Sequence, residues 1–164
     1  MRLYHGALER VEHPRIMPRE LYRPLDFGAG FYTTTDLDQA KRWVCNRLKH
    51  FKKNGFGYVS VYDFNESAAV NFKVKRFEGV CVDWLRFIAE NRLRYNVEHG
   101  FDLVIGPVAN DRVYTVLTLY EGGYYDENVA MEKMKGYRLA DQYLFHTEKS
   151  LSLLKYETSL EVGR

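Results

Sequence analysis

The stretch of residues 26–43 constrains the fold of this chain more than any other. It contains two glycines two positions apart, Gly28 and Gly30, which permit a tight backbone turn and a close approach of other groups. Residues 31–34 follow directly and favour a β-strand, and the next residues favour a helix start. The order loop, strand, helix places Tyr32 at the edge of a cleft, where a flat ligand could stack.

Periodic patterns along the rest of the chain predict both strands and helices. The predicted strands are Arg2–His5, Phe31–Thr34, Tyr58–Phe64, Asn71–Phe77, Asp102–Val108, Gln142–His146 and Leu154–Thr158. The first predicted helix is capped by Thr35 or Asp36 and has Trp43 and Phe51 in its apolar stripe, and the second, Cys81–Tyr95, has Leu93 in its stripe. The other predicted helices are Arg112–Tyr120, a segment capped by Asp126, and Thr147–Leu153. The segment Arg112–Tyr120 also has the β-branched content of a strand, but the polar residues before it and the glycines after it favour a helix.

The irregular alternation of strands and helices predicts an α+β fold. With 164 residues and no internal repeat, we expect a single domain over residues 1–158 and a C-terminal tail over residues 159–164. The net charge of +2 indicates no particular polyanionic partner, and the basic segment Lys41–Lys53 is typical of a solvated helix face. The N-terminus has no apolar signal core and no segment is long enough to span a bilayer, so we expect a cytoplasmic protein without a membrane partner.

Several common catalytic and binding motifs are absent from the sequence. The chain has no phosphate-binding loop with a lysine, no nucleophile elbow and no HExxH pair. Cys45 and Cys81 do not have the spacing of metal ligands, so no metal is expected. Gly28 and Gly30 lack the third glycine of the dinucleotide-binding fingerprint.

Four side chains and one glycine are candidates for a binding site. His5 ends the first predicted strand and can donate to a ligand hydroxyl, while Gly6 lets the backbone approach a ligand closely. Tyr32, Trp43 and Gln142 complete the set. Each residue alone has an ordinary structural explanation, such as a core tyrosine, a core tryptophan or a solvent-facing histidine. The order of all of them along the chain is what favours a site.

Three segments resemble the signature blocks of the diphtheria-toxin-type ADP-ribosyltransferases, the class that includes the poly(ADP-ribose) polymerases. They are Tyr4-His5-Gly6-Ala7, Phe27-Gly28-Ala29-Gly30-Phe31-Tyr32 and Asp141-Gln142-Tyr143-Leu144-Phe145-His146. Over nearly its whole length, Leu3 to Tyr156, the chain also resembles an uncharacterised bacterial family placed in that superfamily. The resemblance implies split antiparallel β-sheets with flanking helices, and NAD bound as co-substrate in a cleft between the sheets.

The resemblance also implies a role for each residue of the first two blocks. His5 would hold a ribose 2′-hydroxyl of NAD, and the backbone of Gly6 would bind the nicotinamide carboxamide. Ala7 replaces the hydroxyl residue usual in the first block. Tyr32 would stack on one face of nicotinamide, and Trp43, at the matching spacing on the following helix, on the other. Two electron-rich ring faces suit a cationic pyridinium.

The third block departs from the superfamily, because Gln142 stands where a glutamate is usual. Cleavage of the ribose–nicotinamide bond builds positive charge on the ribose, which a carboxylate stabilises better than an amide does. Gln142 can still hold a ribose hydroxyl but cannot act as a general base. The resemblance implies catalytic roles for His5, Tyr32 and Gln142. Because Gln142 lacks a charge, it implies NAD binding rather than fast transfer of ADP-ribose.

Three functions are compatible with these observations. The favoured one is a mono-ADP-ribosyltransferase or NAD glycohydrolase, whose acceptor would be a protein, a nucleic acid or water. By analogy, such a protein could be a bacterial toxin-type effector with a neutralising antitoxin partner. The second is a catalytically weak module that binds NAD or ADP-ribose, and the third is a structural or interaction domain. NAD binding and nicotinamide release distinguish the three.

Overall fold

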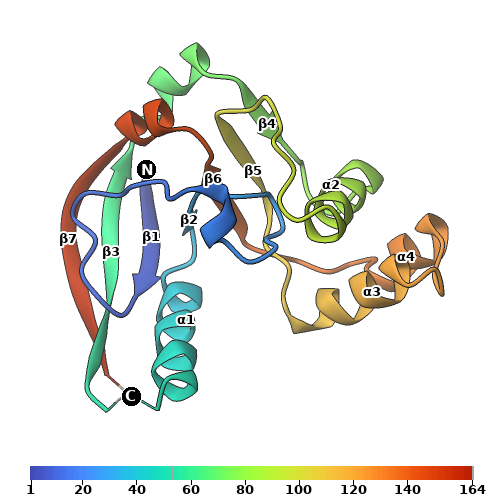
Figure 1. The fold of residues 1–164 in the computed structure, drawn as a ribbon, viewed down its shortest axis with the longest axis horizontal. Helices are drawn as coiled ribbons and strands as arrows, with labels where there is room; N and C mark the ends of the chain where they lie inside the picture. The colour runs from blue at the N-terminus through green and yellow to red at the C-terminus, as the bar shows by residue number, and fades with distance from the viewer. Residues whose placement is uncertain (53, 164) are drawn as a thin grey trace.

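The computed structural model describes residues 1–52 and 54–163, and within them a seven-stranded sheet carries helices on one face (Figure 1). The strands are β1 (Arg2–Ala7), β2 (Phe31–Thr34), β3 (Phe56–Phe64), β4 (Val74–Arg76), β5 (Leu103–Pro107), β6 (Asp141–Phe145) and β7 (Leu154–Gly163). The α-helices are α1 (Leu37–His50), α2 (Val82–Leu93), α3 (Asp111–Glu121) and α4 (Glu127–Lys133). Short 3₁₀ helices are η1 (Arg19–Leu21), η2 (Ser67–Asn71) and η3 (Glu148–Leu153).

The strand order is β4-β5-β6-β2-β1-β3-β7, which confirms the α+β class. The expectation of wholly antiparallel strands is wrong at one edge, because β4 pairs with β5 in parallel. The remaining neighbours are antiparallel. The chain reaches β5 from β4 through α2, and a crossover through a helix is the usual route to a parallel pair.

Strands β1 and β2 share the shortest pairing in the sheet. Within the described residues these strands pair at one position, Tyr4 with Thr34. On either side of this joint the pairing is extensive, since β1 pairs with β3 along all of its length and β2 pairs with β6 along all of its own. The strands thus form one sheet rather than the two separate sheets expected, but its two halves are joined at a single pair.

Two separate apolar clusters lie on the helix-covered face, one on each half of the sheet. On the β1-β3-β7 half, Val44 and Leu48 of α1 pack on Val59. On the other half, α2, α3 and α4 pack on Val104 and Leu144. Figure 1 shows α1 standing apart from the group formed by α2, α3 and α4. The opposite face carries a third cluster, covered by residues of η2 and η3.

Most predicted elements are confirmed, including α3, whose N-cap Asn110 accepts a hydrogen bond from the Val113 N–H at 3.1 Å. Residues 159–163 were expected in a tail, but β7 continues through them and pairs with the first half of β3. This pairing supplies backbone partners that β3 would otherwise lack on that side. Leu93 was expected in the buried stripe of α2, but it is 65% exposed at the last helical turn.

No helix in the described residues combines the length and the apolar character that crossing a membrane requires.

Candidate functional site

The loop before β2 holds the hydroxyl group of Tyr32. Gly28 and Gly30 adopt positive φ angles of 91° and 149°, which favour glycine. The Tyr32 O–H donates to the Gly28 carbonyl at 2.6 Å and accepts from the Phe27 N–H at 3.0 Å. Burial raises the pKa of Tyr32, so the hydroxyl stays protonated at neutral pH. The ring is therefore held at both ends, by β2 and by the loop.

His5 lies beside the narrow joint of the sheet. Its Nδ1–H donates to the backbone carbonyl of Tyr32 at 2.7 Å, and its ring lies 4.3 Å from that of Phe31. Because a carbonyl only accepts, Nδ1 carries the proton. Burial lowers the pKa of His5, so the ring is neutral at pH 7 and Nε2 is an acceptor. His5 was expected to donate a hydrogen bond to a ligand hydroxyl, but in this arrangement its Nε2 can only accept one.

Trp43 projects from α1 next to Gly6. A Cβ placed on Gly6 would lie 2.6 Å from the Ala40 carbonyl oxygen and 3.3 Å from Cδ1 of Trp43, so the glycine allows α1 to approach β1 closely. The indole is 44% exposed, which contradicts its expected place in the apolar stripe of α1. The guanidinium of Arg23 lies 5.8 Å from the centre of the indole ring, in a cation–π contact.

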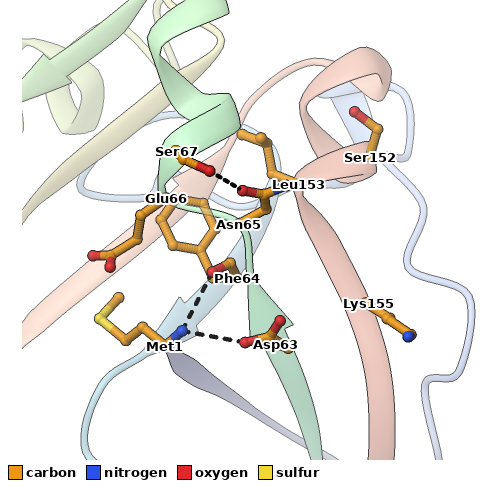
Figure 2. Close-up of a pocket in the computed structure, with 9 residues that line it drawn as sticks. All are labelled: Met1, Asp63, Phe64, Asn65, Glu66, Ser67, Ser152, Leu153 and Lys155. Carbon is orange, nitrogen blue, oxygen red and sulfur yellow. Dashed lines mark hydrogen bonds and ion pairs between the residues drawn. The ribbon is translucent and has the colours of Figure 1, made fainter.

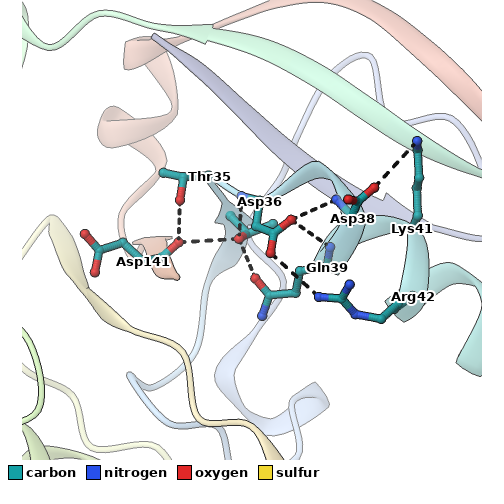
Figure 3. Close-up of polar contacts among 8 residues, drawn as sticks. Thr35, Asp36, Asp38, Gln39, Lys41, Arg42 and Asp141 are labelled. Carbon is teal, nitrogen blue, oxygen red and sulfur yellow. Dashed lines mark hydrogen bonds and ion pairs between the residues drawn. The ribbon is translucent and has the colours of Figure 1, made fainter. Parts of the chain in front are cut away.

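The start of α1 is tied to the strand that carries Gln142. Asp36 caps the helix, accepting from the backbone N–H groups of Asp38 and Gln39. The backbone N–H and the hydroxyl of Thr35 point to the Asp141 carbonyl, at 3.2 and 3.4 Å. Figure 3 shows these contacts joining the first turn of α1 to β6. The position of the Trp43 helix is therefore coupled to β6.

Gln142 is the most unusual polar residue of the sheet. It pairs with Thr34 of β2 and Gly106 of β5 and is only 7% exposed. Its Nε2 is buried and has no hydrogen-bond partner among the described residues. A buried donor left without a partner costs about 1–3 kcal/mol, so such a group requires an explanation.

The structure brings these residues together in pairs. Tyr32 and Gln142 lie on the helix-covered face, diagonally across paired strands, a spacing of about 7–8 Å. His5 contacts the backbone of Tyr32, and Trp43 lies beside Gly6. By strand alternation His5 leaves β1 on the face opposite to Tyr4, so its ring packs on Phe31 on the other face of the sheet from Tyr32 and Gln142. Within the described part of the chain, no hydrogen bond links Gln142 to the other three side chains.

Two surface hollows lie away from these residues. One, of about 620 Å³, lies around Met1, Asp63 and Lys155 at the far end of β3 (Figure 2). The other, of about 520 Å³, lies on the outer side of α1 around Lys41, Cys45 and Lys49. Both are wide open, and neither includes His5, Tyr32, Trp43 or Gln142. No group of three metal-ligating side chains occurs in residues 1–52 and 54–163.

Residues that the sequence patterns did not single out border the site. Asp26 is 9% exposed, and its burial raises its pKa to about 6. His99 and His146 stack with ring centres 4.0 Å apart and contact the carbonyl oxygens of Phe27 and Ala29. Asp26 adjoins the glycine loop in sequence, and this closeness is a signal that could have found it. His99 and His146 come from segments distant from that loop, so no local pattern connects them to it.

Comparisons with known proteins identify the family. No curated protein and no solved structure matches the chain. A family model described as a protein of unknown function, DUF3990, matches residues 1–156, which include every candidate site residue. The chain therefore belongs to the DUF3990 family.

Proposed function

We propose that this protein binds NAD in the region between α1 and α2–α4 and cleaves its nicotinamide–ribose bond, as a mono-ADP-ribosyltransferase or NAD glycohydrolase of the ADP-ribosyltransferase-like fold. The three sequence blocks that resemble the diphtheria-toxin-type enzymes support this proposal. The observation that carries it is the buried Nε2 of Gln142, which has no partner among the described residues and lies on the same face of the sheet as Tyr32.

Gln142 and His5 have hydrogen-bonding capacity that suits a ribosyl nicotinamide. The Nε2–H of Gln142 can donate to a ribose hydroxyl, which offsets the cost of its burial. Nε2 of His5, which has no hydrogen-bond partner among the described residues, can accept from another ribose hydroxyl. The exposed indole of Trp43 holds the cation of Arg23 over its ring, so the pyridinium cation of NAD would take the place of that guanidinium.

A second candidate function has a specific observation in its favour. Gln142 is not a carboxylate, so it stabilises positive charge on the ribose only through a dipole. A protein of the same fold that binds NAD or ADP-ribose with little turnover fits this residue equally well. The resemblance alone supports an acceptor, a toxin-type role and an antitoxin partner. A cytoplasmic location stays a prediction from the sequence.

The experiment that tests the proposal measures NAD binding and nicotinamide release together. A ligand that binds only the folded protein must stabilise it, by about 2.7 kcal/mol at a hundred times its Kd, so NAD should raise the melting temperature. Trp43→Ala should weaken NAD binding roughly tenfold through loss of ring contact.

Phe51→Ala is the matched control, because Phe51 is also an exposed aromatic residue of the α1 end with an arginine, Arg47, over its ring. Equal affinity in both variants would contradict the site. Binding without nicotinamide release would favour the second candidate. Absence of any effect of millimolar NAD would leave only a structural or interaction role.

A further inference from the structure

The outer side of α1 is basic and has no acidic residue beyond its first turn. Between Asp38 and Asp63 the sequence contains no aspartate or glutamate, but it contains Lys41, Arg42, Arg47, Lys49, Lys52 and Lys53. Basic residues in the last turn of a helix also stabilise it through the helix macrodipole. Charge alone therefore does not identify a binding surface here, and the aromatic residues among these cations are what distinguish it.

Carboxylates neutralise only the first half of this helix. The side-chain nitrogens of Lys41 and Arg42 lie 3.9 and 3.6 Å from carboxylate oxygens of Asp38 and Asp36, as Figure 3 shows. In residues 1–52 and 54–163, no ion pair involves the basic residues that follow Arg42 on α1. An anion at the second half of the helix therefore meets cations that no carboxylate in the described residues compensates.

An aromatic ring is exposed among these cations. Phe51, the C-cap of α1, was expected in the apolar stripe of the helix, but it is 51% exposed. The guanidinium of Arg47 lies 5.7 Å from the centre of its ring, and the ring of His50 lies 5.0 Å away in an edge-to-face arrangement. Exposed aromatic rings next to arginines are the groups on which proteins stack the bases of single-stranded nucleic acids.

Phe51 ends a stripe of aromatic and basic side chains along the helix. Residues spaced by three or four positions lie on the same side of a helix, so Trp43, Arg47 and His50 follow one another toward Phe51. All four side chains are exposed. From Trp43 to Phe51 the helix rises about 12 Å, which is roughly the length of three or four stacked nucleotides.

A second, polar stripe lies beside the first. Arg42, Asn46 and Lys49 each precede a member of the first stripe by one position. They are among the residues that line the hollow of about 520 Å³ on this helix. Their guanidinium, amide and ammonium groups all donate hydrogen bonds, which suits the phosphate oxygens of a nucleic acid. One stripe thus suits bases and the neighbouring stripe suits the backbone that joins them.

We propose that the two stripes form a surface that binds single-stranded nucleic acid, with a base stacked on Phe51 and phosphates held by Arg47 and Lys49. A duplex does not offer unstacked bases to a side chain. An acidic protein segment would satisfy the cations, but it has no run of planar rings to stack on Phe51. Binding at this surface goes beyond the proposed function and does not depend on cleavage of NAD, so either can fail without the other.

The first test measures the anisotropy of labelled single-stranded DNA and RNA of about 12 nucleotides, with the whole chain and without NAD. Contacts to about three phosphates should lower the affinity about twentyfold between about 50 and about 200 mM salt. The tighter of the two strands identifies the nucleic acid that the surface prefers. No binding of either strand, no dependence on salt, or equal affinity for a duplex or for polyglutamate would overturn the proposal.

Lys49→Ala should weaken binding about fivefold and make the salt dependence shallower, because one phosphate contact is lost. Lys155→Ala is the matched control. Lys155 is also an exposed lysine without an ion pair in the described residues, but it lies on β7 beside the other hollow. It removes the same charge and should leave the affinity unchanged. Equal losses in the two variants would mean that net charge alone attracts the strand, which would overturn the surface.

Phe51→Leu should weaken binding at least about fivefold, because it keeps an apolar side chain at the helix end but removes the ring on which a base stacks. Phe51→Trp should keep the wild-type affinity. Tyr124→Leu is the control, since Tyr124 is an aromatic residue that is 81% exposed and lies between α3 and α4.

The melting temperature and NAD affinity of each Phe51 variant complete the test. Both should stay at the wild-type values, because Phe51 is half exposed and lies outside the proposed NAD site. Loss of nucleic-acid binding at an unchanged melting temperature then belongs to the ring and not to the fold. Unchanged nucleic-acid affinity in Phe51→Leu, or an equal loss in Tyr124→Leu, would overturn the role of this surface.

Discussion

Gln142 illustrates how much one residue can decide about chemistry. Its position, buried between β2 and β5, is where a side chain either has a partner or destabilises the fold. As an amide it offers a donor to a ligand, but no charge to oppose the cation that forms on the ribose. The rate of bond cleavage is therefore expected to depend on this residue more strongly than NAD affinity does.

Gln142→Glu should raise nicotinamide release roughly a hundredfold, because a carboxylate stabilises the developing charge. The measurement is the steady-state rate at saturating NAD. Gln39→Glu is the control, since it adds the same charge on α1 and its Oε1 acceptor for the Thr34 hydroxyl is retained. No increase in the Gln142 variant would show that the carboxylate is not what limits the rate.

At the scale of elements, α1 connects the two halves of the sheet. Its buried residues pack on the β1-β3-β7 half of the sheet, while its first turn is anchored to β6 of the other half through Thr35 and Asp141. The cap residue Asp36 also lies 3.6 Å from the guanidinium of Arg42. Loosening this first turn should therefore move Trp43 relative to Gln142.

Asp36→Ala should lower the free energy of unfolding by about 1 kcal/mol, through loss of two backbone N–H partners, and should also weaken NAD binding. Denaturant unfolding and NAD titration measure the two effects. Asp126→Ala removes the cap of α4, which accepts from the Val129 N–H at 2.8 Å and lies away from Trp43. This control should lose similar stability without loss of affinity. A fall in affinity in both variants would mean that destabilisation alone weakens binding.

Over the whole molecule, the half-buried His99 and the buried Asp26 have opposite effects on acid stability. Burial, with His146 nearby, lowers the pKa of His99 from 6.5 to about 4. The unfolded chain therefore binds a proton at His99 that the folded chain does not, and stability falls as pH falls through this window. Burial raises the pKa of Asp26 from 3.8 to about 6, so the folded state holds the extra proton there and stability falls as pH rises. Between pH 4 and 6 the two effects oppose each other.

Single substitutions should separate these effects. His99→Gln should leave a stability that declines as pH rises from 4 to 6, and Asp26→Asn one that increases. The limiting slope is about 1.4 kcal/mol per pH unit for a fully buried group. The His99 contribution should be smaller because solvent screens a partly exposed ring. Urea unfolding at several pH values measures both slopes, and identical slopes in the two variants would contradict the assignment.

The elements themselves could be predicted well because their signals are local. Asn110 and the glycines after Tyr120 mark the ends of α3, although its β-branched residues also fit a strand. The extension of β7 to Gly163 could not be predicted, since it depends on the distant strand β3. The parallel β4–β5 pair and the exposure of Leu93 likewise depend on which neighbours surround a segment.

The sequence by itself determined the α+β class and most of the helices and strands, because caps and periodicity are properties of nearby residues. The site formed by His5, Tyr32, Trp43 and Gln142 stays a prediction from short motifs. Only the tertiary structure decided that the indole of Trp43 is exposed and that Nε2 of Gln142 is buried without a partner in the part of the chain that the structure describes. It also decided that Asp26 is a buried carboxylate. Burial, hydrogen-bond satisfaction and pKa depend on groups that folding brings together from distant parts of the chain, so no local pattern encodes them.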